Sequence, residues 1–272
     1  MNLQNKSDEI RIKTLEIHKR AKETRIASSL SPIEIFVALF YGNIIKFNPK
    51  NPQDKARDRF IISKGHGSIC MYPILADLGY FDEKELLNVG KKGSFLGSIP
   101  DPLIPGYETI NGSLGHGLGV GAGMAYGLKN SNSNEKVVVL VGNGELQEGS
   151  NWEAIMFAKQ YNLSNLIVIV DSNKKQMLDF SKNILDIEPM SDKFKSFGWE
   201  SIEVKDGHNT ADLLEGLKKA FFNDSIAPKV VIANTIKGKG VDKLEKSPLA
   251  HILSLSDDEI EFAIKKIKDK KD

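Results

Sequence analysis

The chain has one cysteine, almost no net charge and no long apolar run. The single Cys70 excludes an internal disulfide and is typical of the reducing cytoplasm. The 37 Lys and Arg nearly balance the 36 Asp and Glu, so there is no basic excess that indicates nucleic acid as a partner. The basic run 265–271 is short and interrupted by an acid, and it predicts a solvated helix end. Residues 1–13 lack the apolar core of a signal peptide, and no segment reaches membrane-spanning length. We therefore expect a soluble, cytoplasmic protein.

Residues 137–173 have the most informative pattern in the chain. The β-branched run 137–141 is followed by the glycine turn 142–144, a helix-patterned segment, and a second apolar run that closes on Asn173. Strand, turn, helix and strand predict one βαβ unit with polar residues at the carboxyl ends of both strands. In open parallel sheets, ligands bind at those ends.

The residues at these two strand ends are suited to a metal ion and a diphosphate. We expect Asn143 and Asn173 to lie side by side, where their carboxamide oxygens are ligands for a hard cation. Gly142 and Gly144 allow the backbone to approach a phosphate group. The alternatives are an ordinary glycine turn in an unrelated α/β domain, or a dinucleotide site, which would need a third glycine at a spacing that this turn lacks.

The order of the expected elements predicts an α/β fold with one mostly parallel sheet and helices on both faces. The length permits one domain with a large core, and by itself it would also permit two. The loop 90–114 is rich in glycine and proline and is expected to line the site. Helices are expected at 8–22, 31–40, 67–80, 115–128 and 212–222, and strands at 58–63, 137–141, 166–170, 201–204 and 230–234.

Five motifs in order give the chain a family resemblance. They are DRFIISKGHGS at 58–68, NGSLGHGLGVGAGMAYGLK at 111–129, GNGELQEG at 142–149, KDGHN at 205–209 and NTIKGKGV at 234–241. The third begins a segment that resembles the thiamine diphosphate signature. Together they resemble the transketolase family, and most closely the amino-terminal subunit of transketolases split over two polypeptides. The resemblance implies a thiamine diphosphate-binding fold in which 1–272 form a single diphosphate-binding domain.

The histidines are the first candidates for chemistry. His66 lies between two glycines after an apolar strand, and the matching family histidine donates to diphosphate oxygens. His251 matches a family histidine that faces both cofactor and substrate, although its own context, PLAHIL, is less diagnostic. His116 starts a helix, which suits either an anion or a simple structural cap. For His208 we expect a structural role in a turn, and for His18 an exposed position on the first helix.

The resemblance implies a set of ligands for thiamine diphosphate and for Mg²⁺ or Ca²⁺. Cofactor contacts are expected from glycines, histidines and neighbouring polar residues, namely His66, Gly115, His116, Gly142, Gly144, Glu145, Asn173 and His251. Metal contacts are expected at Asn143, Asn173 and Lys175. His66 and His251 are also the expected catalytic residues. Glu148 matches a position near the family's subunit interface, where a carboxylate network links two active sites.

Three positions depart from the family pattern. Asn143 replaces an aspartate, which keeps a carbonyl oxygen for the metal but removes one negative charge, so metal affinity should fall. In ETRIASSLS at 23–31, Arg25 stands where a substrate-contacting histidine is expected, and Ser98 replaces a second such histidine. An arginine can bind a carboxylate or phosphate through two hydrogen bonds. We therefore expect Arg25 and Ser98 to mark a changed sugar substrate.

The resemblance also implies a partner. Transketolases carry a pyrimidine-binding domain, which supplies the activating glutamate, and a carboxyl-terminal domain, and the motifs of neither follow here. We expect these domains on a separately encoded chain, in an α₂β₂ assembly. The predicted activity is that of a transferase that moves a two-carbon ketol unit from a ketose, or ketose phosphate, to an aldose. The alternatives are a non-catalytic regulatory or assembly paralogue, and a component of a two-chain 2-oxoacid dehydrogenase or decarboxylase.

Overall fold

The computed structural model describes residues 1–22, 25–110 and 112–269. Three predicted segments extend outside these ranges. They are the motif at 23–31, which loses its first two residues, the motif at 111–129, which loses its first residue, and the basic run at 265–271, which loses its end.

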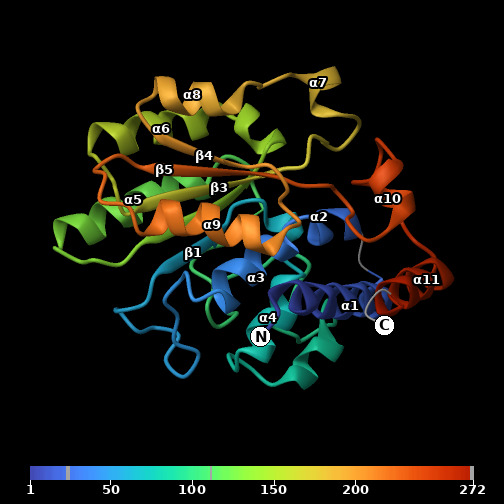
Figure 1. Cartoon of the computed structure of the whole chain (residues 1–272). Coiled ribbons are helices and arrows are strands. Elements are labelled where there is room, and N and C mark those ends of the chain that lie inside the picture. The colour runs from blue at the N-terminus through green and yellow to red at the C-terminus, as the bar shows by residue number, and fades with distance from the viewer. Residues whose placement is uncertain (23–24, 111, 270–272) are drawn as a thin grey trace.

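A parallel sheet forms the centre of the molecule (Figure 1). In the described part of the chain it has five strands in the order β1-β2-β3-β5-β4, and every pairing is parallel. The strands are β1 (Arg59–Ile62), β2 (Val137–Gly142), β3 (Leu166–Ser172), β4 (Glu200–Val204) and β5 (Lys229–Asn234). The apolar runs that predicted strands are therefore confirmed, as is the parallel α/β architecture.

Helices cover both faces of this sheet, as predicted. In β2, Val138 and Leu140 face a core that includes residues of α1 (Leu3–Ala21), α3 (Ile33–Tyr41) and α9 (Thr210–Phe221). Val137, Val139 and Val141 face the opposite core, with α5 (Gly117–Asn130), α6 (Gly149–Gln160) and α8 (Met190–Ser196). This alternation is the two-residue period of a strand buried on both sides. Figure 1 shows α6 and α8 above the sheet and α1, α3 and α9 below it.

Short elements complete the chain around the carboxyl ends of the strands. They are α2 (Ile26–Leu30), η1 (Gly65–Gly67), α4 (Met71–Asp77), η2 (Glu83–Asn88), η3 (Gly144–Gln147), α7 (Ser181–Ile184), α10 (Asp242–Lys246) and α11 (Asp257–Lys268). The turns that follow β1, β2, β3 and β5 all leave the sheet at the same edge, because the four strands are parallel. Within the described residues, no helix combines the length and apolarity that a membrane crossing needs.

The prediction for His18 is wrong. This side chain is 2% exposed, and its Nε2 lies 3.1 Å from the hydroxyl of Ser29. The first helix was expected to keep one solvent face, but α11 packs against α1 on that side (Figure 1). Cys70 is buried, as expected for a small core residue.

Candidate active site

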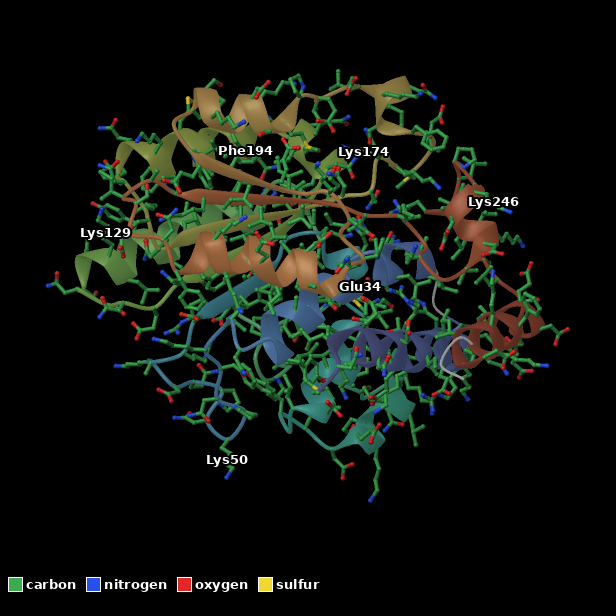
Figure 2. The ribbon with its side chains drawn as sticks, viewed as in Figure 1. Glu34, Lys50, Lys129, Lys174, Phe194 and Lys246 are labelled. Atoms are coloured by element: carbon green, nitrogen blue, oxygen red, sulfur yellow. The ribbon has the colours of Figure 1, made fainter. Side chains whose placement is uncertain are left out.

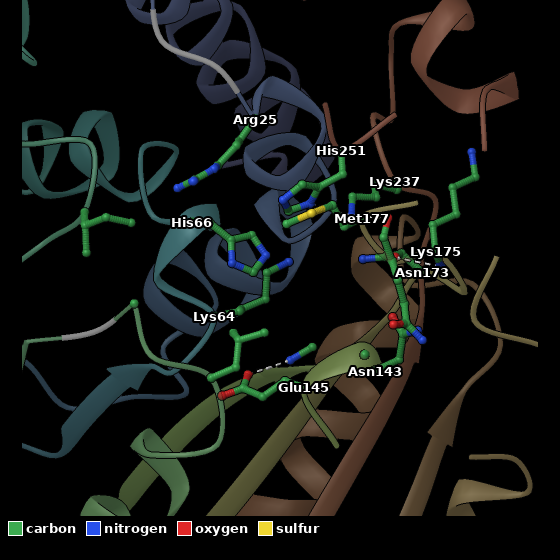
Figure 3. A pocket seen from close by; sticks show the side chains of 16 residues that line it. Arg25, Lys64, His66, Asn143, Glu145, Asn173, Lys175, Met177, Lys237 and His251 are labelled. Atoms are coloured by element: carbon green, nitrogen blue, oxygen red, sulfur yellow. Dashed lines mark hydrogen bonds between the residues drawn. The ribbon is translucent and has the colours of Figure 1, made fainter. Parts of the chain in front are cut away.

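A cavity of about 270 Å³ opens at the carboxyl edge of the sheet (Figure 3). Four cationic side chains and a single carboxylate belong to its lining among the described residues, so its charge suits a polyanion. The lining residues are Arg25, Lys64, His66, Ile99, Gly112, Leu114, Gly142, Asn143, Gly144, Glu145, Asn173, Lys175, Gln176, Met177, Lys237 and His251.

A buried ion pair lies beneath the cavity. The ammonium of Lys64, from the turn after β1, contacts the carboxylate of Asp171 near the end of β3, and both side chains are at most 2% exposed. Asp171 also accepts hydrogen bonds from the hydroxyls of Ser31 (2.6 Å) and Thr235. Burial alone would raise the pKa of Asp171, but Lys64 and these hydroxyls hold it below its usual value. The pair joins four segments of chain and engages both carboxylate oxygens of the aspartate.

Glu145 organises the glycine turn from within. It is 2% exposed and accepts hydrogen bonds from the backbone N–H groups of Gly115 (3.0 Å) and Gly142 (3.1 Å) and from the hydroxyl of Ser63. Burial raises the pKa of its carboxyl group, and the hydrogen bonds oppose that shift. The predicted cofactor contacts Glu145 and Gly115 therefore touch each other, with Glu145 on the cavity wall.

The glycines of the turn permit close approach of other groups. A Cβ built on Gly144 would lie 3.0 Å from Cγ of Gln176, whose buried Nε2 donates to no acceptor within the described part of the chain. Gly115 has φ +85°, and a Cβ there would lie 2.7 Å from Cβ of Glu148. An unpaired donor beside a bare stretch of backbone fits an anionic group bound in the cavity.

The predicted metal ligands are placed next to one another but offer only neutral oxygens. Asn143 and Asn173 lie side by side at the ends of β2 and β3 (Figure 3). The amide nitrogen of Asn143 donates to Ser181 (2.6 Å), which turns its carbonyl oxygen the other way. The ammonium of Lys175 donates to the carbonyls of Glu245 (2.6 Å) and Ser247 (2.9 Å), so only the main chain of Lys175 is available to a metal.

These donors fit a hard cation in type, since Mg²⁺ and Ca²⁺ prefer carboxamide and carbonyl oxygens as well as carboxylates. Across the described residues, no group of three or more histidine, cysteine, aspartate or glutamate side chains is placed to hold a metal ion. A cation here would depend on the negative charge of its ligand more than on the protein.

The two predicted catalytic histidines meet in the cavity. The ring centroids of His66 and His251 are 5.1 Å apart, with an interplanar angle of 67°. Burial and the nearby cation of Lys64 lower the pKa of His66 to about 2. Burial and the cations of Lys237 and Arg25 lower the pKa of His251 to about 4. Both imidazoles are therefore neutral at physiological pH and can each donate and accept one hydrogen bond.

Arg25 and Ser98, the predicted substrate positions, have different placements. Arg25 is exposed, lines the cavity and has φ +68°, a left-handed conformation in which non-glycine residues are uncommon. Figure 3 shows its guanidinium extending over the cavity toward His66. Ser98 is exposed and is not part of the lining, which Ile99 supplies instead.

The remaining candidates lie at the rim or in the core. His116 is exposed at the start of α5, where its Nδ1 lies 3.1 Å from the carbonyl oxygen of Leu114. Glu148 is exposed at the start of α6. His208 has the structural role expected of it, because its Nδ1 contacts Glu34 (2.9 Å) and its Nε2 accepts from the N–H of Ile236 (2.7 Å).

Sequence reasoning missed Lys64, Gln176, Met177 and Lys237. Lys64 and Lys237 lie inside quoted motifs, directly before Gly65-His66 and within the KGKGV run. A lysine within one or two residues of a strand end in a phosphate-binding pattern is the signal that could have identified them. Gln176 and Met177 had no such signal.

Comparison with known proteins now identifies the family. Residues 3–270 match the family described as "Transketolase, thiamine diphosphate binding domain", and the chain belongs to this family. The chain is 40% identical over 243 residues to one of the subunits named for the apulose-4-phosphate transketolase of Actinobacillus succinogenes, covering 89% of this chain and 87% of the relative. It is 34% identical to the 6-deoxy-6-sulfo-D-fructose transketolase subunit SqwG of a Clostridium species, covering 95% and 93%.

Longer transketolases match along only part of their length. Human transketolase is 35% identical over 250 residues, which cover 92% of this chain and 39% of the human protein. The crystal structure of Campylobacter jejuni transketolase matches with a TM-score of 0.91 and 29% identity, covering 98% of this chain and 43% of the other. The chain thus spans about two fifths of these proteins. These comparisons favour a transketolase over a 2-oxoacid dehydrogenase component.

Proposed function

We propose that this chain is the diphosphate-binding subunit of a two-chain transketolase, which moves a two-carbon ketol unit from a ketose phosphate to an aldose. The observation that carries the proposal is the coverage. The chain matches 87% of one apulose-4-phosphate transketolase subunit but only 39% of human transketolase. A cavity lined by four cations at the carboxyl edge of the sheet supports the same assignment.

Thiamine diphosphate, when bound, supplies a carbon nucleophile that makes and breaks C–C bonds next to a carbonyl group. The backbone of Gly142 and Gly144, the Nε2 of Gln176 and the side chains of His66 and Lys237 would hold its diphosphate. Asn143, Asn173 and the main-chain carbonyl of Lys175 would hold Mg²⁺ against that diphosphate. Because these three offer no charge, metal and diphosphate should bind together and only weakly apart.

His66 and His251 are the proposed catalytic residues. Their low pKa values keep them uncharged beside Lys64 and Lys237, so each can donate a hydrogen bond to a substrate oxygen and accept a proton in turn. Neutral donors also avoid adding charge to a cavity that already holds four cations.

Arg25 is the proposed specificity residue, and we extend no such role to Ser98 without a contact to the cavity. The guanidinium of Arg25 lies over the histidine pair (Figure 3), where it would bind a carboxylate or phosphate of the sugar through two parallel hydrogen bonds. His116 is exposed at the cavity rim and is proposed to contact the cofactor's outer edge.

A partner chain would supply the rest of the enzyme. Residues 1–272 are proposed to form one diphosphate-binding domain, and the partner to carry the pyrimidine-binding and carboxyl-terminal domains in an α₂β₂ assembly. Glu148 is exposed beside the cavity at the start of α6. It is proposed to lie in the interface, because an exposed carboxylate there can find a hydrogen-bonding partner on the second chain.

A non-catalytic assembly subunit is the second candidate, and Asn143 is the observation that favours it. Without a carboxylate at this position, the metal site formed by the described residues has no negative charge of its own. In this case, the cavity would bind cofactor poorly even when the partner is present.

Calorimetry separates the two candidates. Thiamine diphosphate with Mg²⁺ is titrated into the chain alone and into an equimolar mixture with the transketolase subunit encoded beside it. Binding that is tight only in the mixture supports the proposed enzyme. Absence of binding in both states supports the non-catalytic candidate.

A further inference from the structure

Lys237 is buried in the cavity wall, directly behind His251. Its side chain is 4% exposed, and its Nζ lies 3.0 Å from the Nδ1 of His251. Figure 3 shows the two residues side by side, with His66 on the other side of the His251 ring. A lysine ammonium has hydrogen-bond donors and no acceptor, so its contact with a histidine nitrogen has only one possible direction.

The loop that carries Lys237 is fixed by hydrogen bonds on both sides. The N–H of Ile236 donates to Nε2 of His208 (2.7 Å), and the N–H of Gly238 donates to the carbonyl of Ala27 (3.0 Å). The carbonyl of Lys239 accepts from the buried guanidinium of Arg11 (2.8 Å). The position of Lys237 is therefore determined by three elements packed around the loop, and its side chain reaches His251 without ordering a flexible segment.

Two donors face the same nitrogen of His251. The hydroxyl of Ser28 lies 3.3 Å from Nδ1, slightly farther than Lys237. Both contacts are satisfied when Nδ1 is the acceptor, which places the ring proton on Nε2. No described residue makes a hydrogen bond to Nε2, so this N–H is free to reach a group in the cavity.

The surrounding charges act in the same direction. The charged groups that face His251 are the cations of Lys237, Arg25 and Lys64, and they oppose a second proton on the ring. Those that face Lys237 are Lys64, Lys175 and the carboxylate of Asp171. Burial, first, and then Lys64 lower the pKa of Lys237 to about 7, so an anion nearby would favour its charged form.

We propose that Lys237 is a positioning residue that holds His251 as the Nε2–H tautomer, and that an anion bound in the cavity strengthens this hold by keeping Lys237 protonated. As a neutral amine, Lys237 could accept a hydrogen bond from Nδ1–H, but as an ammonium it can only donate. Occupation of the diphosphate site is thereby linked to the hydrogen-bonding state of a second residue. The use of that N–H in catalysis rests on the proposed function, whereas the tautomer itself does not.

Histidine side-chain NMR of the ¹⁵N-labelled chain tests the proposal without a partner or substrate. The chain has five histidines, and His251→Gln identifies the signal of interest. In the unaltered chain, His251 should show the shifts of an Nε2–H tautomer. In Lys237→Met, it should become a mixture of tautomers, and its titration midpoint should rise from about 4 toward the ordinary value of 6.5.

Matched variants make the result specific. Lys239→Met alters the other lysine of the same motif, which is outside the cavity lining, and should leave His251 unchanged. Ser28→Ala should also leave the tautomer in place, because Lys237 is the nearer donor. Lys237→Gln provides a second test if the methionine variant is unstable, since an amide can donate and accept and should also give a mixture. Unchanged His208 signals show that a variant is folded.

Inorganic pyrophosphate tests the link to anion binding. Added at pH 8, above the pKa of Lys237, it should increase the Nε2–H population in the unaltered chain and not in Lys237→Met. The proposal is overturned if His251 keeps the same tautomer and midpoint in folded Lys237 variants, or if the unaltered chain carries the proton on Nδ1. A pyrophosphate response that persists in Lys237→Met would overturn the link to the anion.

Discussion

Replacing Lys64 by methionine should destabilise the protein strongly. The carboxylate of Asp171, which is 0% exposed, would lose its buried cation and keep only the hydroxyls of Ser31 and Thr235 as major partners. Breaking a buried ion pair by removing one partner costs about 3–5 kcal/mol. For a chain of this size that corresponds to a melting temperature lower by roughly 6–15 °C.

An exposed ion pair provides the control. Lys243 and Glu259 are 2.7 Å apart, with side chains 49% and 39% exposed, and Lys243→Met should cost at most about 1 kcal/mol. Urea unfolding of the two variants measures both values. A second substitution, Asp171→Asn, should recover much of the stability lost in Lys64→Met, because it removes the uncompensated charge.

The pH dependence gives the sign of the effect. In the unaltered chain, the lowered pKa of Asp171 contributes stability above pH 3.8, and this is lost as the pH falls through the folded pKa. In Lys64→Met, burial raises that pKa instead, so the deficit is largest at neutral pH and shrinks as acid protonates Asp171. A deficit below about 1 kcal/mol at pH 7, no larger than that of the exposed pair, would refute the reasoning.

Three further predictions concern the cavity. Asn143→Asp adds a carboxylate to the metal site and should raise the Mg²⁺-dependent affinity for thiamine diphosphate by about tenfold or more, as measured by calorimetry with the partner; an unchanged affinity would show that Asn143 is not a ligand. Arg25→His should raise KM for ketose phosphates more than for unphosphorylated ketoses, and an equal change for both would exclude an anion contact. The low pKa values of His66 and His251 mean that the unfolded chain binds more protons than the folded one below pH 6.5. Stability should therefore fall from pH 6.5 toward pH 4, and His251→Gln should make this decline less steep in urea titrations, whereas an identical slope would contradict a buried neutral His251.

The sheet was predictable because its signal is local. The runs at 137–141 and 166–170 are apolar and β-branched, and a strand buried on both faces needs little more than that. The glycine turn and Asn173 could be placed at one edge because parallel strands end together. What was predicted of the site from strand ends therefore lies where it was expected.

Contacts between distant segments were not predictable in the same way. Lys64 and Asp171 are 107 residues apart, and no pattern near either residue indicates their pairing. The ammonium of Lys175 turns away from the metal position because the carbonyls at the end of α10 accept its hydrogen bonds. His18 is buried because α11, more than 200 residues later, packs on α1. Figure 2 shows how densely side chains fill the space between such segments. Each of these outcomes depends on tertiary packing that local sequence does not encode.

The most direct test of the account is a ketol-transfer assay with this chain, its partner chain, and an equimolar mixture of the two. Thiamine diphosphate, Mg²⁺, a panel of ketose phosphates and an aldose acceptor are supplied in each case, and sugar products are separated by mass. The account predicts product only in the mixture, with a maximum at equal amounts of the two chains. Product from either chain alone, or none from a mixture that binds thiamine diphosphate, would contradict it.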